Sequence, residues 1–354
     1  MKYSIIIPVY NRPDECEELL QSLSQQTFPK ADYEVIVVED GSERTCEKEC
    51  EKYSQLLDIH YFRKENGGPG MARNYGVEHA QGDYVIILDS DVVLPQGYLE
   101  EVEKELTAQP CDAFGGPDSA HESFTQMQKA ISYSMTSFFT TGGIRGGKKK
   151  LDKFFPRSFN MGIRRKVYTE LKGFSKMRFG EDIDFSYRII EAGYTTRLFP
   201  EAWVWHKRRT DLDKFFKQVY NSGIARINLG LRHPGTTKLV HAMPAVFTIG
   251  VILLLIAAVV LRLWAQSPAS TDVVLLGIPS SLLWIVPLVP ILLFILLIFI
   301  DSSIRNRSLV IGFLSIEAAF VQLFGYGLGF LKALWMRYVL KRGEFSAFEK
   351  NFYE

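Results

Sequence analysis

The feature that most constrains this 354-residue chain is a long apolar stretch in its C-terminal third. Between His241 and Ile300 the only charged residues are Arg262 and Asp272. About 20 consecutive apolar residues are enough to cross the hydrocarbon of a bilayer as a helix. The residues before His241 carry most of the 41 basic and 40 acidic side chains. The sequence therefore predicts a water-facing part followed by a membrane part.

The membrane part divides into three apolar segments. We expect spans at about 243–264 and 273–300, and the prolines of the second favour a tilt or a kink. A third segment, at about 308–338, contains the glycine-rich stretch GYGLG at 325–329. We expect these glycines to break the helix into a re-entrant or interfacial hairpin, with a full span as the alternative.

The distribution of basic residues predicts an orientation. Lys and Arg flank both expected spans on the side of residues 1–235 and of Arg305, whereas the linker at 265–272 has none. Cytoplasmic loops carry the excess of Lys and Arg. We therefore expect residues 1–235 to form a cytoplasmic domain, 236–342 the membrane region and 343–354 a tail. The expected location is the bacterial inner membrane.

Charge and cysteine content narrow the classes of protein. The net charge is +1, which gives no sign of a nucleic-acid partner. The opening residues are typical of a first strand rather than of a secretory signal. Cys46 and Cys50 have a spacing of one helical turn, which could hold a metal ion, but we expect ordinary packed or exposed thiols. Cys16 and Cys111 complete the set, and a reducing compartment fits all four.

The first part of the chain alternates apolar strands with helical segments. Expected strands are YSIIIPVY, YEVIVVED, IHYFR and YVIILD, and each is followed by a helix, at Pro13–Gln25, Glu43–Leu57, Met71–Ala80 and Gln96–Thr107. Continuous apolar strands separated by helices indicate a parallel sheet that is covered on both faces. We therefore predict an α/β fold with a mixed, mainly parallel central sheet, followed by helical transmembrane segments.

Acidic side chains follow two of these strands at the edge where ligands bind in such sheets. Asp40 ends the second strand, and Asp89-Ser90-Asp91 follows the fourth. Carboxylates close together near a buried sheet repel one another unless a cation compensates them. Oxygen ligands suit Mg²⁺ or Mn²⁺, which commonly link carboxylates to substrate phosphates. The alternative is a turn whose aspartates only cap the next helix.

Several sequence blocks, taken together and in order, carry a family resemblance. The blocks are SIIIPVYNR, VVEDGS, NGGPGMARNYGVEHAQGDYVIILDSD, FNMGIRRKVYTELKGF, FGEDIDFSYRIIEAGY and WHKRR. The chain resembles the family-2 inverting glycosyltransferases of the GT-A fold over about residues 3–230. The resemblance implies a nucleotide-sugar donor, a divalent metal ion and a single displacement that inverts the anomeric carbon.

The resemblance also implies roles for individual residues on the donor side. Asp40 would accept a hydrogen bond from the ring N–H of the base, which uracil, thymine and guanine all offer. Asp91, His206 and Asp89 would hold the metal ion, and Asp89 would also meet the ribose. The remaining donor-side residues are Pro8, Tyr10, Arg73, Ser90, Arg208 and Arg209. For Arg208 and Arg209, contact with anionic lipid is an equal alternative.

On the acceptor side the resemblance assigns the general base to Asp182, in GEDIDF. Glu181 and Gln218 would lie beside the acceptor. Without the resemblance, Glu181 and Asp182 would pass as ordinary acids in the first turn of a helix.

The sequence thus favours a membrane-anchored, hexosyltransferase-type inverting enzyme in polysaccharide biosynthesis. It would use Mg²⁺ or Mn²⁺, a nucleoside diphosphate sugar (UDP-sugar favoured) and a lipid-linked or cell-surface polysaccharide acceptor, in contact with membrane lipids. Two alternatives stay open: a non-catalytic nucleotide-sugar-binding scaffold, and a glycosyltransferase acting on polyprenyl phosphate.

Overall fold

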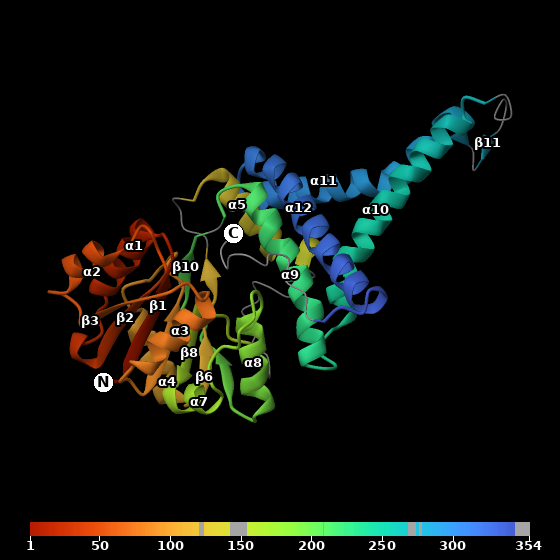
Figure 1. Cartoon of the computed structure of the whole chain (residues 1–354). Coiled ribbons are helices and arrows are strands. Elements are labelled where there is room, and N and C mark those ends of the chain that lie inside the picture. Colours follow the sequence, from red (N-terminus) through yellow and green to blue (C-terminus); the bar gives the residue numbers. More distant parts are fainter. Residues whose placement is uncertain (120–123, 142–153, 208, 268–273, 276–277, 344–354) are drawn as a thin grey trace.

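A seven-stranded mixed sheet forms the centre of the N-terminal part, in the order β3-β2-β1-β4-β8-β6-β9 (Figure 1). The computed structural model describes residues 1–119, 124–141, 154–207, 209–267, 274–275 and 278–343. The strands are β1 (Tyr3–Val9), β2 (Tyr33–Asp40), β3 (Ile59–Lys64), β4 (Tyr84–Leu88), β6 (Ala113–Gly115), β8 (Asn160–Arg164) and β9 (Thr196–Leu198). Only β8 runs antiparallel to its neighbours, so the predicted mixed, mainly parallel sheet is confirmed.

Helices cover both faces of this sheet. One face packs against α1 (Pro13–Ser24), α2 (Glu47–Tyr53) and α4 (Tyr98–Ala108). The other packs against α3 (Pro69–Glu78), α7 (Arg165–Glu170) and α8 (Glu181–Glu191). Within β1, Ile5 and Ile7 face the first set of helices and Ile6 faces the second. A strand that buries both faces needs an unbroken apolar sequence, which explains the run YSIIIPV.

Helix α2 is shorter than the expected Glu43–Leu57. The side-chain oxygen of Asn11 accepts hydrogen bonds from the backbone N–H groups of Glu43 and Arg44, at 2.8 and 3.0 Å. A side chain that satisfies these donors competes with the helix. The segment after β2 is therefore held as a loop, and the helix begins only at Glu47.

A second, three-stranded sheet lies beside the first and has the order β5-β10-β7. Its strands are β5 (Val92–Val93), β7 (Asp118–Ser119) and β10 (Val204–His206). In this sheet His206 pairs with Val92, which immediately follows Asp91. A histidine distant in the sequence is thereby brought to the residues that follow β4.

Three C-terminal helical segments are long and apolar enough to cross a membrane: Leu239–Trp264, Ser280–Asn306 and Leu309–Val339. They comprise α10 (Leu239–Trp264), the 3₁₀-helix η3 (Ser280–Leu288) with α11 (Val289–Asn306), and α12 (Leu309–Leu334), which continues as a π-helical turn, Trp335–Val339. The short strands β11 (Val274–Leu275) and β12 (Ile278–Pro279) lie between α10 and η3, at the far end of α10 (Figure 1).

Two helices join the apolar segments to the rest of the chain. Helices α5 (Gln126–Thr136) and α9 (Leu212–Arg232) pack against α12 through a shared apolar cluster that includes Ile131, Val219 and Ala318. A four-residue helix, α6 (Phe138–Thr141), follows α5. The division at residue 235 stays a prediction, and most of the expected linker and tail (268–273 and 344–354) lies outside the described residues.

The expected break at GYGLG is wrong, because α12 continues without interruption through Gly325–Gly329. These glycines serve close packing instead. A Cβ at Gly329 would lie 2.0 Å from the carbonyl oxygen of Tyr220 on α9, and one at Gly327 would lie 2.5 Å from the carbonyl oxygen of Pro244 on α10. Small residues let helices approach closely within a bilayer. Pattern alone does not distinguish a packing glycine from a helix-breaking one.

Candidate active site

The predicted acidic edge exists, because β1, β2 and β4 are parallel neighbours whose carboxyl ends share one side of the sheet. Asp40 is the last residue of β2, and Asp89 follows β4 directly. The loop after β1 is tied to that after β2 by a 2.9 Å hydrogen bond from the Asn11 N–H to Ser42 Oγ. Pro8 is a buried residue of β1, while Tyr10 is partly exposed just beyond the strand.

Asp40 is fully buried and holds the turn that precedes α3. Its carboxylate accepts hydrogen bonds from the backbone N–H groups of Gly67 and Gly68, at 2.9 and 2.7 Å, and from Lys64 Nζ at 2.6 Å. Gly68 has a φ of 89°, a conformation that residues with a Cβ seldom adopt. Asp40 thus positions the start of the helix that carries Arg73, and its predicted contact with a base stays a prediction.

Asp89, Asp91 and His206 come together as a candidate metal centre. One ligand atom from each lies within 4.8 Å of those of the other two. His206 Nε2 is 3.2 Å from Asp91 Oδ1, and the imidazole stacks on Phe159 with ring centroids 5.0 Å apart. Asp118 on β7 lies on the other side of the ring, with Oδ2 3.7 Å from His206 Nδ1. A carboxylate beside the second ring nitrogen commonly orients a ligating histidine.

The donor set fits a hard or borderline divalent cation. Two carboxylates and an imidazole are acceptable to Mn²⁺, and the oxygens also suit Mg²⁺. Asp91 Oδ1 is buried and makes no hydrogen bond of normal geometry, which leaves it available to a metal ion. Burial disfavours the charge of Asp91, but His206, Arg12 and Arg209 outweigh it and hold its pKa below the usual range. Asp91 therefore stays an anion.

Arg73 connects this centre to the first turn of α8. Its guanidinium donates to Asp89 Oδ1 at 2.7 Å and to Glu181 Oε1 at 2.9 Å, and it lies over the ring of Phe174. Only 3% of Arg73 is exposed. Burial lowers the pKa of Arg73, but the two carboxylates more than offset that and raise it. The resemblance predicted Arg73 on the donor side, and the structure places it between two carboxylates of the predicted site.

Glu181 and Asp182 are the first two residues of α8, and both are buried. Burial and the neighbouring Asp182 raise the pKa of Glu181, against the effect of Arg73. Asp182 differs, because its Oδ2 accepts a 2.6 Å hydrogen bond from Arg157 Nε. Burial raises the pKa of Asp182, but Arg157 outweighs this effect and the net shift is downward. Two adjacent carboxyl groups therefore have opposite shifts, and only Asp182 is held firmly ionised.

Helix α9 packs behind this turn. A Cβ at Gly180, which precedes α8 with a φ of 84°, would lie 3.3 Å from the Cβ of Ala225 on α9. Gln218 is a partly exposed residue of the same helix, seven positions or about two turns earlier. No contact joins Gln218 to Glu181 or Asp182 among the residues that the structure describes. Arg208 lies outside the described residues, and Ser90 is buried between Asp89 and Asp91.

Three contact residues were missed in the sequence: Arg12, Asp118 and Arg157. Arg12 donates to Asp91 at 2.7 Å, although 79 positions separate the two residues. Asp118 reaches His206 only because β7 pairs with β10. Each of these contacts depends on the tertiary fold, and no local pattern indicates them. The one available signal was the position of Arg12, three residues after the end of β1.

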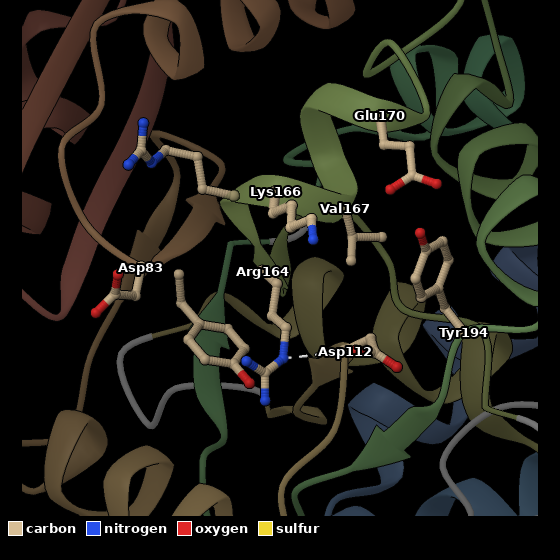
Figure 2. Close-up of a pocket in the computed structure, with 9 residues that line it drawn as sticks. Asp83, Asp112, Arg164, Lys166, Val167, Glu170 and Tyr194 are labelled. Atoms are coloured by element: carbon tan, nitrogen blue, oxygen red, sulfur yellow. Dashed lines mark ion pairs between the residues drawn. The ribbon is translucent and has the colours of Figure 1, made fainter.

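A cavity of about 600 Å³ lies at the other end of the strands, away from Asp40 and Asp89 (Figure 2). Its lining includes Asp83, Arg164, Lys166 and Glu170, around the start of β4 and the end of β8. Arg164 pairs with Asp112 across it. None of the predicted site residues lines this cavity, so its size does not identify the active site.

Solved structures and sequence families similar to this chain are glycosyltransferases. A solved structure of the mannosyltransferase PcManGT from Pyrobaculum calidifontis, in complex with GDP-Man and Mn²⁺, has a TM-score of 0.57 at 15% identity and covers 94% of this chain and 87% of that one. The fold is therefore of the GT-A class. The family Glycosyl transferase family 2 matches residues 4–172. This part of the chain is therefore similar to family-2 glycosyltransferases.

Two curated proteins are similar to this chain in sequence. Poly(ribitol-phosphate) beta-N-acetylglucosaminyltransferase TarS from Staphylococcus aureus is 42% identical over 103 residues, which are 28% of this chain. The match spans only 18% of the length of TarS. Glycosyltransferase AglE from Haloferax volcanii is 25% identical over 261 residues, which are 70% of this chain and 80% of AglE.

Proposed function

We propose that this chain is a membrane-anchored inverting glycosyltransferase. It transfers a sugar from a nucleoside diphosphate sugar, with UDP-sugar favoured, to a lipid-linked or cell-surface polysaccharide acceptor. The reaction is a single displacement with Asp182 as the general base and a divalent cation at Asp89, Asp91 and His206. TarS is by name a transferase that acts on poly(ribitol-phosphate), and this supports a polymeric acceptor.

One observation carries the proposal. Arg73 joins Asp89 of the candidate metal centre to Glu181, the residue next to Asp182, through hydrogen bonds of 2.7 and 2.9 Å. The metal-binding and base-bearing segments come from β4 and α8, far apart in the sequence, yet they share one buried arginine. A donor held by the first segment would therefore present its sugar to the second.

Asp182 accepts the proton in this reaction. The acceptor hydroxyl gives its proton to the Asp182 carboxylate while its oxygen bonds to the anomeric carbon, and the nucleoside diphosphate leaves from the opposite face. A positioned base of this kind contributes about 10²–10⁴-fold in rate. Because Arg157 holds Asp182 ionised, the base is ready at neutral pH, and the acceptor must take the place of Arg157 at Oδ2.

A divalent cation at Asp89, Asp91 and His206 would stabilise the negative charge that develops on the departing diphosphate. Neighbouring residues orient the side chains that would bind this cation. Asp118 and Phe159 hold the His206 ring from two sides, and Arg12 fixes one oxygen of Asp91 at 2.7 Å. Asp91 Oδ1 remains for the cation.

The membrane attachment rests on three apolar helical segments, two of which, α10 and α12, pack against α9. Helix α9 contacts both the first turn of α8, through Gly180, and α12, through Gly223. An acceptor carried by a lipid at the membrane surface would therefore approach along α9. This geometry favours a lipid-linked or growing surface polymer over a soluble sugar. The distribution of Lys and Arg favours a domain on the cytoplasmic side of the bacterial inner membrane.

The test is protection against thermal unfolding by a panel of nucleotide sugars, on the full chain in detergent, with and without Mn²⁺. A ligand at 100 times its Kd stabilises the folded state by about 2.7 kcal/mol. We expect one nucleoside diphosphate sugar to protect the wild-type chain only with the metal ion, and Asp91→Asn to lose this protection. Asp83→Asn, at the other end of the strands, is the matched control and should keep it.

The outcomes separate the alternatives. Protection without any turnover of the sugar nucleotide, even with membrane-derived acceptors present, would favour the non-catalytic scaffold. Turnover with polyprenyl phosphate as the acceptor would favour that alternative enzyme. If no sugar nucleotide protects the chain, or if Asp91→Asn is protected as well as wild type, the proposed donor site is wrong.

A further inference from the structure

Three of the four cysteines form a buried cluster on one face of the central sheet. Cys16 lies on α1, Cys46 directly precedes α2, and Cys50 lies on α2. Their Sγ atoms are all within 4.8 Å of one another, and none of the three forms a disulfide. Their exposed fractions are 0, 0 and 4%. The spacing of Cys46 and Cys50 in the sequence hinted at a pair, but the fold adds Cys16.

A buried carboxylate lies at the border of this cluster. Glu39 is the penultimate residue of β2, is 1% exposed and accepts the backbone N–H of Cys46 on Oε1 at 2.7 Å. Its second oxygen, Oε2, is buried and accepts no hydrogen bond. Glu39 forms no ion pair among the residues that the structure describes. A buried carboxylate without a counter-charge is costly unless a cation is bound nearby.

The chemistry of these groups selects a soft or borderline metal ion. Thiolates are preferred by Zn²⁺ and other thiophilic ions, whereas Mg²⁺ and Ca²⁺ prefer oxygen ligands. Zinc binds thiolate sulfur at about 2.3 Å with tetrahedral angles, which places the sulfur atoms roughly 3.8 Å apart. The observed separations need only small side-chain adjustments to reach this value.

We propose that Cys16, Cys46 and Cys50 hold one Zn²⁺ ion, with Glu39 as the fourth ligand. Glu39 stands next to the cluster, because its Oε1 accepts the backbone N–H of Cys46. This structural site is separate from the centre at Asp91 and His206 and takes a different class of metal. It ties α1 and α2 to the end of β2, immediately before Asp40.

The site would brace the donor-binding edge without taking part in the reaction. Asp40 holds the turn before α3, and Glu39 would anchor the preceding residue of the same strand to the metal ion. Helix α2 has only seven residues, too few to be stable alone. Metal binding contributes directly to folding at such sites. The proposal does not depend on the glycosyltransferase function.

The test measures zinc in the full chain, purified in detergent without a metal-binding tag. We expect one zinc ion per chain, lost in Cys16→Ser and in Cys50→Ser. Cys111→Ser is the matched control, because Cys111 is also a buried free thiol of the same core but stands apart from the cluster, and it should keep the zinc. Asp91→Asn should keep it as well, which separates this site from the candidate catalytic centre.

A spectroscopic measurement covers variants that fold poorly. Adding Co²⁺ to the reduced, zinc-free wild-type chain should produce a thiolate-to-cobalt charge-transfer band and the strong visible bands of a tetrahedral site. Glu39→Gln should keep the charge-transfer band, alter the visible bands and weaken zinc affinity by at least about tenfold. Unchanged affinity in Glu39→Gln would remove Glu39 from the ligand set.

Two results would overturn the proposal. One is the absence of both zinc and the cobalt charge-transfer band in the reduced chain. The other is a count of two free thiols rather than four in the chain denatured without reductant, which would make the cluster a disulfide-forming pair. Four free thiols with zinc released on denaturation is the expected result.

Discussion

Replacing Arg73 by methionine is the change whose cost can be worked out most directly. Arg73 is 3% exposed and donates to Asp89 and Glu181 at 2.7 and 2.9 Å. Methionine keeps most of the packing of the arginine stem and removes the charge together with its hydrogen-bond donors. Glu181 would then be a buried carboxylate without an ion-pair partner among the described residues, while Asp89 is partly solvated, with a side chain 29% exposed. Most of the cost should therefore come from Glu181.

Breaking a buried ion pair by removing one partner costs about 3–5 kcal/mol. For a domain of this size that corresponds to a fall in the midpoint of thermal unfolding of roughly 6–20 °C. The assay is thermal unfolding of the full chain in detergent. Lys104→Met is the control, because its pair with Glu101 is exposed to solvent and should leave the midpoint nearly unchanged.

A double-mutant cycle tests the reason for the loss. If the cost is the uncompensated Glu181, Arg73→Met should be less damaging in a Glu181→Gln background, by about 1–3 kcal/mol. A loss below about 1 kcal/mol in the wild-type background, or costs that simply add, would refute the reasoning on the buried network.

Two further predictions concern helix packing and pH. Gly329→Val should destabilise the chain by about 1–3 kcal/mol, because the new side chain meets the Tyr220 carbonyl, whereas Gly250→Val meets no atom within 4 Å and should be nearly neutral in the same unfolding assay. Arg157→Met should move the acidic limb of the kcat/KM profile to higher pH. Arg157 lowers the pKa of Asp182, so without it Asp182 takes up its proton, and stops acting as a base, at a higher pH. An unshifted limb would mean that Asp182 is not the titrating base.

The parts of the fold that were predicted correctly depend on local pattern. The strand Tyr33–Asp40 coincides with the apolar run YEVIVVED, because a strand buried on both faces must be apolar throughout. The edge position of Asp40 and Asp89 followed from the parallel arrangement alone. The resemblance supplied His206, whose arrival beside Asp91 depends on the pairing of β10 with β5.

The parts that were missed depend on contacts between distant segments. Arg157 and Asp182 are 25 positions apart and belong to different elements, and nothing in either local sequence indicates their 2.6 Å contact. The same holds for Cys16, which joins Cys46 and Cys50 only when α1 and α2 pack together. Gly325 and Gly329 have two opposite meanings in a sequence, breaking or close packing, and only the neighbouring α9 decides between them.

The most direct test of the central claim compares Asp182→Asn with wild type in the same preparation. Binding of the donor and Mn²⁺ is followed by thermal protection, and turnover by release of the nucleoside diphosphate. The account predicts that Asp182→Asn binds donor and metal ion as wild type does, while its turnover falls by at least about 10²-fold. Wild-type turnover in Asp182→Asn would contradict the assignment of the base and the shared site from which it was inferred.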